Sequence, residues 1–263
     1  MRGDFRRGAP VSAPMPGRLD NALERMHAGE AYFDYITSQE SDRQIRAAFQ
    51  QRVLELAPPR AALLDFGAGP GIDARFFAER GFTVHAYDVD PRMSDFFADH
   101  CGDLIEAGSV TLQRGSYVDF LTSKNPGPPR RADLIISNFA PLNLVEDLAA
   151  LFERFEALSA PHGRILASVI NPYYRGDMKC RWWWRRLPEL WRRGCYFMPG
   201  PQAPHMRRGL ADFALQSSPH FKLTRVFAGY LGGPPAGVVP TRARLADWWH
   251  LRRGRFIFLQ FDK

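Results

Sequence analysis

A strand that passes directly into a glycine turn constrains this chain more than any other feature of its sequence. Residues 61–66 form a short apolar run, which suits a strand buried on both faces of a parallel sheet. Gly67, Gly69 and Gly71 follow at alternate positions, and a helical pattern then covers residues 72–80. Ligands bind outside the carboxyl ends of the strands in an open parallel sheet, so this turn is the first place to expect one.

Strand-like and helix-like patterns alternate along the rest of the chain. Apolar runs at 83–88, 110–113, 133–137 and 164–170 predict four more strands. A helix is expected before the last of them, with its apolar face at Leu144, Leu148, Leu151, Phe155 and Leu158. Two final runs, 221–227 and 256–261, predict an antiparallel pair at the sheet edge. The pattern predicts an α/β fold, with a mostly parallel seven-stranded sheet and helices on both faces.

Size and composition fit one globular domain. The chain has 263 residues, of which 45% are hydrophobic and 24% charged. Residues 1–18 are rich in Pro, Gly and Arg and predict a disordered leader, which leaves 19–263 for the domain. The sequence shows no apolar run of membrane-spanning length, no signal peptide pattern and no CxxC pair among three cysteines, so a cytoplasmic protein is expected. The seven histidines lack metal-ligand spacing, and no metal is expected.

Two aspartates complete the glycine turn and narrow the choice of ligand. Asp65 ends the strand just before the glycines, where a carboxylate repels the pyrophosphate of a dinucleotide and favours a cationic group. The dinucleotide pattern also requires a glycine three positions after Gly69, where this chain has Ile72. Asp88 ends the next strand, and a carboxylate there accepts hydrogen bonds from the ribose hydroxyls of a nucleoside. The combination predicts a nucleoside cofactor that carries positive charge.

Four segments together resemble one protein family. The first two are Leu63-Leu-Asp-Phe-Gly-Ala-Gly-Pro-Gly71 and Gly81-Phe-Thr-Val-His-Ala-Tyr-Asp-Val-Asp-Pro-Arg-Met93, and the others are Ser137-Asn-Phe-Ala-Pro-Leu142 and Pro161-His-Gly-Arg-Ile-Leu166. They resemble the class I S-adenosylmethionine (SAM) dependent methyltransferases, in their broad small-molecule branch. The resemblance covers about residues 45–170 and implies a Rossmann-like fold with SAM as the cofactor.

The resemblance also implies which residues contact the cofactor. The acid and glycines after the first strand would hold the amino-acid half of SAM, Asp88 the ribose, and Val89 and Met93 the adenine. After the third strand the family often has an aspartate facing the adenine amino group. This chain has Ser116 there, whose hydroxyl can still form a hydrogen bond. The expected cofactor residues are Asp65, Gly67, Ala68, Gly69, Gly71, Asp88, Val89, Met93, Ser116, Tyr117, Asn138 and Phe139.

Several polar residues near this region have a structural role that competes with a functional one. Asp73 is expected to serve the first turn of its helix in preference to the cofactor, and Asn143 to be a helix N-cap in preference to a catalytic group. Asp119 is an alternative helix cap. For Asn138 and Phe139 a plain loop role and a functional role stay equally open.

One segment concentrates the positive charge of the chain. The net charge is +7. Between residues 173 and 208 the basic residues are Arg175, Lys179, Arg181, Arg185, Arg186, Arg192, Arg193, Arg207 and Arg208, whereas the acids are only Asp177 and Glu189. The surplus of this segment equals that of the whole chain. These arginines either form a solvated face or meet an anionic acceptor, a carrier protein, a membrane surface or RNA.

The same segment is rich in aromatic residues and breaks the strand–helix alternation. It contains Trp182, Trp183, Trp184, Trp191 and Tyr196. Three consecutive residues cannot share one helix face, so at least one tryptophan is expected to be exposed or to line a pocket. Residues 172–220 are predicted to form a cap or lid inserted after the fifth strand.

Three functions are compatible with these features. The favoured one is methyl transfer from SAM to an O or N atom, less readily a C atom, of a small aromatic or anionic metabolite. The acceptor-side candidates are Asn138, Tyr173, Tyr174 and His205, and no general base is indicated. The second is RNA methylation through the basic segment 175–208. Against it, enzymes that methylate base amino groups carry an Asn-Pro-Pro-Tyr signature after the fourth strand, whereas Asn171-Pro-Tyr-Tyr174 follows the fifth. The third is a non-catalytic SAM-binding protein.

Overall fold

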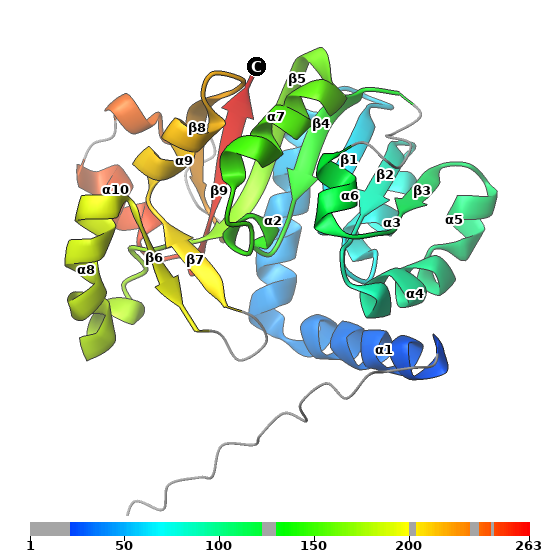
Figure 1. Ribbon diagram of the computed structural model, residues 1–263, viewed down its shortest axis with the longest axis horizontal. Helices are drawn as coiled ribbons and strands as arrows, with labels where there is room; N and C mark the ends of the chain where they lie inside the picture. Colours follow the sequence, from blue (N-terminus) through cyan, green and yellow to red (C-terminus); the bar gives the residue numbers. More distant parts are fainter. Residues whose placement is uncertain (1–21, 123–129, 200–203, 232–236, 243–244) are drawn as a thin grey trace, which may run out of the picture.

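The computed structural model describes residues 22–122, 130–199, 204–231, 237–242 and 245–263. The predicted leader, residues 1–18, lies outside these ranges. A seven-stranded sheet forms the centre, in the order β3-β2-β1-β4-β5-β9-β8 (Figure 1). Its strands are β1 (Ala62–Phe66), β2 (Thr83–Tyr87), β3 (Val110–Gln113), β4 (Ala132–Ser137), β5 (Ser159–Ile170), β8 (Lys222–Ala228) and β9 (Phe256–Asp262).

Strand direction follows the predicted pattern. Strands β1 to β5 pair in parallel, whereas β9 pairs antiparallel with both β5 and β8. The final two strands therefore form the antiparallel pair expected at the sheet edge, with β8 outermost. The carboxyl ends of the parallel strands meet at one edge, so the loops after β1, β2, β4 and β5 gather there.

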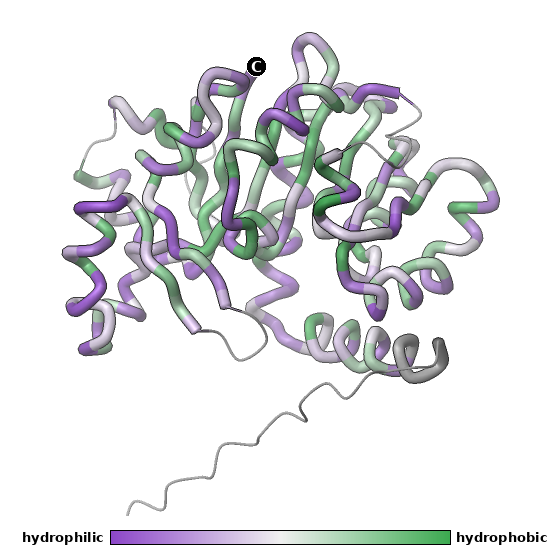
Figure 2. The backbone as a smooth tube through the Cα atoms, in the orientation of Figure 1, coloured by the Kyte–Doolittle hydropathy of each residue, from purple (hydrophilic) through white to green (hydrophobic). Residues whose placement is uncertain are grey.

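Helices cover both faces of the sheet. One face packs against α2 (Glu40–Leu56), α3 (Ile72–Ala78) and α4 (Pro91–His100), and the other against α6 (Tyr117–Leu121), α7 (Leu148–Leu158), α9 (Leu210–Ser217) and α10 (Leu245–Leu251). Successive strand residues point to opposite faces, so Leu63 joins the first layer and Leu64 the second, and every residue of β1 is buried. Figure 2 shows apolar residues along the central strands and polar ones on the outer helices. The predicted Rossmann-like α/β fold is confirmed.

The helix that follows β4 begins later than its apolar spacing predicts. α7 starts at Leu148, and Asp147 caps it by accepting a hydrogen bond from the backbone N–H of Ala150 at 3.0 Å. Leu144 is 59% exposed and precedes the helix. Asn143 closes a short 3-10 turn, η1 (Pro141–Asn143), so its predicted role as a helix N-cap is wrong. Its side-chain amide instead bonds the backbone of Ile170 at the end of β5 and the backbone of Met206.

The segment after β5 leaves the sheet and forms a small subdomain. It contains the 3-10 turn η2 (Asp177–Lys179), helix α8 (Arg181–Arg193) and an antiparallel hairpin of β6 (Cys195–Met198) and β7 (His205–Arg208). Helix α9 then returns to the main layer and packs beside α7. In Figure 1 this subdomain stands at one end of the molecule. No helix among the described residues has the length and hydrophobicity needed to cross a membrane.

An N-terminal helix that the sequence pattern does not predict packs on the helices of one face of the sheet. α1 (Ala22–Ser38) packs on α4. A Cβ atom on Gly29 would stand 2.5 Å from the Cβ of Phe96, so only glycine permits this close approach. Phe33 completes the contact, with its ring 5.4 Å from that of Phe96 and 5.1 Å from that of His100.

Candidate functional site

The glycine turn has a backbone that only glycine adopts readily. Gly67, Gly69 and Gly71 have φ of 76°, 56° and 84°. A Cβ on Gly67 would lie 2.4 Å from Pro141, and one on Gly71 would lie 2.8 Å from the Sγ of Cys101, so both positions are closed by packing. Gly69 differs, because no atom beyond its own chain neighbours lies within 4 Å of the place where its Cβ would be. The turn therefore presents an open backbone surface at Gly69.

Asp88 stands directly beside this opening. Its Oδ2 accepts a hydrogen bond from the backbone N–H of Gly69 at 2.7 Å, and its Oδ1 accepts one from Asp90 at 2.8 Å. Burial raises the pKa of the Asp88 carboxyl, and these backbone donors lower it in part. A carboxylate has about four acceptor sites, so beside the backbone donors of Gly69, Val89 and Asp90 it keeps capacity for a ligand hydroxyl.

Asp65 supplies a buried carboxylate, one oxygen of which lacks a hydrogen-bond donor in the described part of the chain. It is only 2% exposed, and its Oδ2 has no hydrogen-bond donor among the described residues. Burial raises the pKa of Asp65 well above the ordinary carboxyl value; the charges of Asp73 and Asp88 raise it further, and Arg46 opposes them. A buried, unsatisfied carboxylate is costly, and a cationic ligand group beside it would offset that cost.

Asp73 joins three parts of the site and leaves little capacity for a ligand. Its Oδ2 accepts hydrogen bonds from Arg46 at 2.6 Å and from the side chain of Asn138 at 3.0 Å, and its Oδ1 accepts one from Gln50 at 2.7 Å. Asp73 lies in the first turn of α3 as expected, yet its partners come from α2 and from the loop after β4. This network fixes that loop against the glycine turn.

The loop after β4 holds two residues in an unfavourable backbone conformation. Phe139 and Ala140 have φ of 60° and 69°, a region that non-glycine residues rarely adopt. The Ala140 N–H donates to the Ser168 carbonyl at 3.0 Å, and the Arg46 guanidinium lies 4.7 Å from the centre of the Phe139 ring. Such strain persists where the surroundings enforce it, and it clusters at ligand sites.

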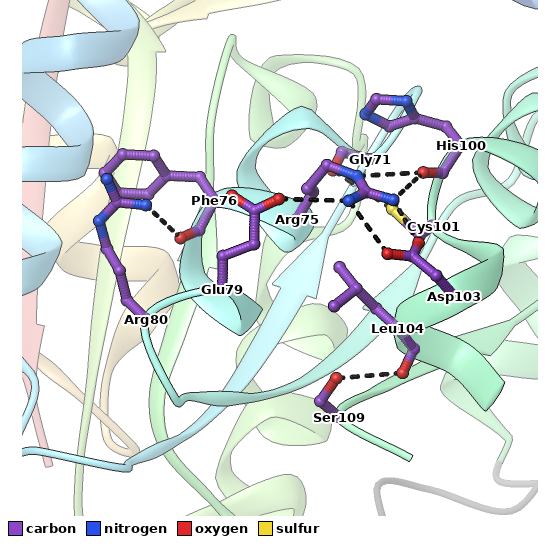
Figure 3. A network of polar contacts seen from close by, with 10 residues as sticks. All are labelled: Gly71, Arg75, Phe76, Glu79, Arg80, His100, Cys101, Asp103, Leu104 and Ser109. Atoms are coloured by element: carbon purple, nitrogen blue, oxygen red, sulfur yellow. Dashed lines mark hydrogen bonds and ion pairs between the residues drawn. The ribbon is translucent and has the colours of Figure 1, made fainter. Parts of the chain in front are cut away.

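A polar network supports the far end of the glycine turn (Figure 3). Arg75 of α3 donates to the carbonyl of His100 at 3.1 Å and to Glu79 at 3.2 Å, and forms an ion pair with Asp103 of α5 (Gly102–Glu106). The thiol of Cys101 lies 3.6 Å from the Gly71 carbonyl. Burial raises the pKa of that thiol to about 12, so it is neutral and contributes packing, not nucleophilic reactivity.

The remaining expected cofactor residues follow β2 and β3, and they differ in exposure and in hydrogen bonding. Val89 is 58% exposed directly after Asp88, and Met93 is half-buried on α4. Ser116 is the N-cap of α6 in a capping box with Asp119: its Oγ accepts from the Asp119 N–H at 3.2 Å and donates to the Asp119 carboxylate at 2.7 Å. The half-buried Tyr117 directs its hydroxyl to the Asp147 carbonyl at 3.5 Å.

Helix α1 adds a residue that sequence reasoning missed. Burial raises the pKa of Tyr32, and the nearby charges of Arg46 and Asp88 act on it in opposite directions. Tyr32 is half-buried on α1, and its surroundings include the charges of Arg46 and Asp88. The helix precedes the region that carries the family motifs, and no local signal marks this tyrosine.

The acceptor-side candidates lie at three places in the chain. Asn138 is bonded to Asp73 beside the glycine turn. Tyr173 and Tyr174 follow Asn171, whose side chain donates to the carbonyls of Leu251 and Gly254 at 2.8 and 2.9 Å. Burial raises the pKa of Tyr173. His205 begins β7 and accepts a hydrogen bond from Arg207 at 3.4 Å.

Asn143 links the hairpin to the sheet edge. Its Oδ1 accepts from the Ile170 N–H at 3.0 Å, and its Nδ2 donates to the Met206 carbonyl at 2.6 Å. The side chain is fully buried. One amide therefore joins the end of β5 to β7, the strand that carries His205.

Two arginines of the basic segment are structural. Arg207 is 9% exposed and pairs with Asp177 at 2.8 Å. Arg208 is 4% exposed, pairs with Asp212 at 2.8 Å, and donates to the carbonyls of Val145 and Glu146. Neither role that the sequence leaves open for the arginines, a solvated face or a site for an anionic partner, applies to these two, because their guanidiniums are buried in ion pairs.

The tryptophans separate as the helix geometry requires. Trp183 is 4% exposed, and its indole N–H donates to the Pro172 carbonyl at 2.8 Å. Trp184 is 59% exposed and Trp191 is 73% exposed. Trp182 is half-buried, with the Arg207 guanidinium 5.9 Å from its ring centre. The expectation of at least one exposed tryptophan is confirmed. Among the described residues, no group of three or more His, Cys, Asp or Glu side chains is arranged to hold a metal ion.

Comparisons with known proteins agree with this geometry. The sequence profile of a family described as "Methyltransferase domain" matches residues 39–202. One similar solved structure is 1,6-didemethyltoxoflavin-N1-methyltransferase from Burkholderia thailandensis, with bound 1,6-didemethyltoxoflavin and S-adenosylhomocysteine. Its sequence is 19% identical, the match covers 100% of this chain and 98% of that chain, and the TM-score is 0.56. An S-adenosylmethionine dependent methyltransferase from Mesorhizobium loti is 17% identical, with coverage of 83% and 100% and a TM-score of 0.54. No curated protein matches the chain significantly. At these identities the structural likeness shows the fold.

Proposed function

The chain belongs to the class I SAM-dependent methyltransferases, and we propose that it transfers the methyl group to an oxygen or nitrogen atom of a small molecule. The family match spans most of the chain, and the sheet order and the site geometry fit this chemistry. The solved structure with bound 1,6-didemethyltoxoflavin is one small-molecule enzyme on this fold. For the present chain, the acceptor is inferred from its own residues.

One observation carries the cofactor assignment. The unpartnered Oδ2 of Asp65, the open backbone at Gly69 and the carboxylate of Asp88 lie around the same turn. Asp65 suits the ammonium group of SAM, and Asp88 suits its ribose hydroxyls. When bound, SAM supplies a methyl group on a sulfonium leaving group. The protein then has to orient the acceptor and exclude water.

The acceptor side is assigned to the loop after β4 and the subdomain after β5. Asn138 and Phe139 extend the cofactor loop, and Asn143 holds β7 to the same edge. Tyr173 keeps its proton at neutral pH, because burial raises its pKa, so it would orient an acceptor as a hydrogen-bond donor and would not act as a base. Residues 172–208 would thus form a cap over the acceptor.

A small acceptor is favoured over RNA because two arginines of the subdomain are neutralised in buried ion pairs. Arg207 and Arg208 are buried in ion pairs, and Trp183 is part of the subdomain core. These residues stabilise the cap and leave fewer cations for a phosphate backbone. A binding protein without catalysis is the remaining alternative, and it differs by transferring nothing.

The test combines binding and transfer. Calorimetry with SAM, S-adenosylhomocysteine and NAD should give low-micromolar binding of the first two and none of NAD, as is common for enzymes that work near metabolite levels. Binding of NAD without SAM would overturn the cofactor assignment. Label transfer from methyl-labelled SAM is then measured with a library of small phenols, amines and carboxylic acids, and with mixed RNA. Transfer to RNA alone would replace the small-molecule proposal.

A further inference from the structure

Helix α8 carries two large apolar side chains that folding does not bury. Trp184 and Trp191 are 59% and 73% exposed, and Pro188 between them is also exposed. Residues spaced by three and four lie on one helix face, so these three form a single outward stripe. Trp183 and Leu190 point the other way and are buried, 4% and 3% exposed. The stripe is therefore turned away from the protein interior.

A stripe of arginines runs beside the tryptophans on the same helix. Arg181, Arg185 and Arg192 are exposed, and none has an ion-pair partner among the described residues. Arg186 and Arg193, in contrast, pair with Glu189 at 3.0 and 3.6 Å. The outward face of α8 thus joins uncompensated positive charge to indole rings.

A second helix at the same end of the molecule repeats the pattern. In α10, Leu245 is 83% exposed and Trp249 is 64% exposed, one helical turn apart. Asn171 bonds the carbonyl of Leu251 at the end of α10, and Trp183 bonds the carbonyl of the adjacent Pro172, so one short segment anchors both helices. Figure 1 shows α8 and α10 at this end, away from the glycine turn.

We propose that the outward face of α8, formed by Trp184, Pro188, Trp191, Arg181, Arg185 and Arg192, binds the surface of a membrane that contains anionic lipids. Indole rings favour the headgroup region of a bilayer, and arginines beside them attract its negative charge. Binding of this kind is peripheral, with the helix lying in the interface plane. The proposal does not depend on which acceptor the enzyme methylates.

Other occupants fit this face less well. A second copy of the chain would bring the same arginines into opposition, and like charges repel. RNA would use the arginines and could stack on an indole, but Pro188 offers no π face for a base. The bilayer interface alone uses the apolar groups, the indoles and the cations together.

The experiment uses the full chain and two kinds of vesicle. Co-sedimentation is measured with phosphatidylcholine vesicles and with vesicles of equal parts phosphatidylcholine and phosphatidylglycerol, at low and high salt. We expect binding to the anionic vesicles, weakened by salt, with a blue shift of tryptophan fluorescence. Trp184→Ala/Trp191→Ala and, separately, Arg181→Glu/Arg185→Glu should each lower the partition coefficient about tenfold or more.

Matched controls separate the surface from general effects. Arg60→Glu/Arg131→Glu makes the same change in net charge at exposed positions that precede β1 and β4, and should bind vesicles like the unmodified protein. Leu215→Ala removes a 71% exposed apolar side chain from α9 and should do the same. All variants should keep their SAM affinity, which separates failure of this proposal from failure of the methyltransferase assignment. Only the tryptophan variant should melt at a slightly lower temperature, because the Trp184 indole N–H donates to the Met178 carbonyl at 2.9 Å.

Four outcomes would overturn the proposal. The first is no binding to anionic vesicles, and the second is equal binding by the control and α8 variants. The third, in the absence of vesicle binding, is salt-sensitive binding of single-stranded RNA that the arginine variant loses. The fourth, also without vesicle binding, is dimerisation in light scattering that the tryptophan variant abolishes. The third would assign the face to RNA, and the fourth to a second copy of the chain.

Discussion

The carboxylate of Asp88 accepts a hydrogen bond from the backbone of Gly69 at 2.7 Å, so the acid after β2 braces the turn after β1. At the start of the turn, the N–H groups of Gly67 and Ala68 both donate to the Tyr87 carbonyl of β2, at 2.8 and 3.0 Å. The residue expected to hold the ribose therefore also shapes the loop that would receive the rest of the cofactor.

Asp88→Ala should weaken SAM binding by about 1.5–3 kcal/mol, the usual scale for a hydrogen bond to a charged group. The sequence alone suggests that folding would be almost unchanged. The bonds to Gly69 and Asp90 instead predict a loss of about 1–2 kcal/mol in the free energy of unfolding, because two backbone donors lose their acceptor. Calorimetry and urea denaturation measure the two effects. Asp88→Asn, which keeps one acceptor oxygen, should lose less stability than Asp88→Ala, and unchanged SAM affinity in both would place the ribose elsewhere.

Gly69→Val should abolish SAM binding while the protein still folds. Space around the missing Cβ is open, so the fold loses only about 1–2 kcal/mol for a left-handed backbone, whereas the ligand loses its approach to the turn. The comparison variant is Gly71→Ala, whose Cβ would meet Cys101 at 2.8 Å and should lower the melting temperature more. Normal affinity in Gly69→Val would show that the cofactor does not approach this residue.

Asp65→Asn should stabilise the ligand-free protein by about 1–3 kcal/mol at neutral pH and weaken SAM binding at least tenfold. The folded protein holds the Asp65 proton to a higher pH than the unfolded chain, since burial raises its pKa. Between the two pKa values the folded state binds more protons, so stability falls as pH rises through that window. The substitution removes this fall.

The same titration predicts how cofactor binding depends on pH. SAM affinity should rise as pH rises through the raised pKa of Asp65, because the ammonium group requires the ionised carboxylate. Thermal unfolding and calorimetry across a pH series are measured for the unmodified protein and for Asp65→Asn. A stability profile of Asp65→Asn that parallels the unmodified protein would show that Asp65 is not the titrating group.

Trp183→Ala should cost about 3–5 kcal/mol of stability and impair methyl transfer, because it removes a buried ring and leaves the Pro172 carbonyl without its donor. Trp184→Ala should leave methyl transfer within about twofold, since its ring faces outward. Single-turnover assays with the identified acceptor compare the two. Equal impairment would mean that Trp184 also contributes to the acceptor site.

Asn143→Ala should loosen the cap without touching the cofactor. It leaves the Ile170 N–H and the Met206 carbonyl unpaired in a buried place, at a cost of about 2–4 kcal/mol. We expect KM for the acceptor to rise and SAM affinity to stay within about threefold. Asn143→Asp, which retains the acceptor for Ile170, should recover part of the stability. An unchanged KM would separate Asn143 from the acceptor side.

Local patterns predicted most of the sheet. Each strand is a run of a few apolar residues bounded by turn formers, so β1, β2 and β3 lie within a residue of their predicted positions. The cofactor turn is equally local, because the glycines and Asp65 are adjacent in the chain. The start of α7 was missed because Leu144 keeps the helical spacing while a preceding 3-10 turn takes a different path.

The sequence by itself determined the strand, the glycine turn and the two acids, because those features depend on a few neighbouring residues and on the period of a strand. Only the tertiary structure decided what distant polar residues do. Asn143 bonds β5 and β7, and Arg208 is buried against Asp212 and two carbonyls. Such roles depend on which helices and loops pack together, and a buried ion pair and a solvated arginine have the same local sequence until that packing is formed.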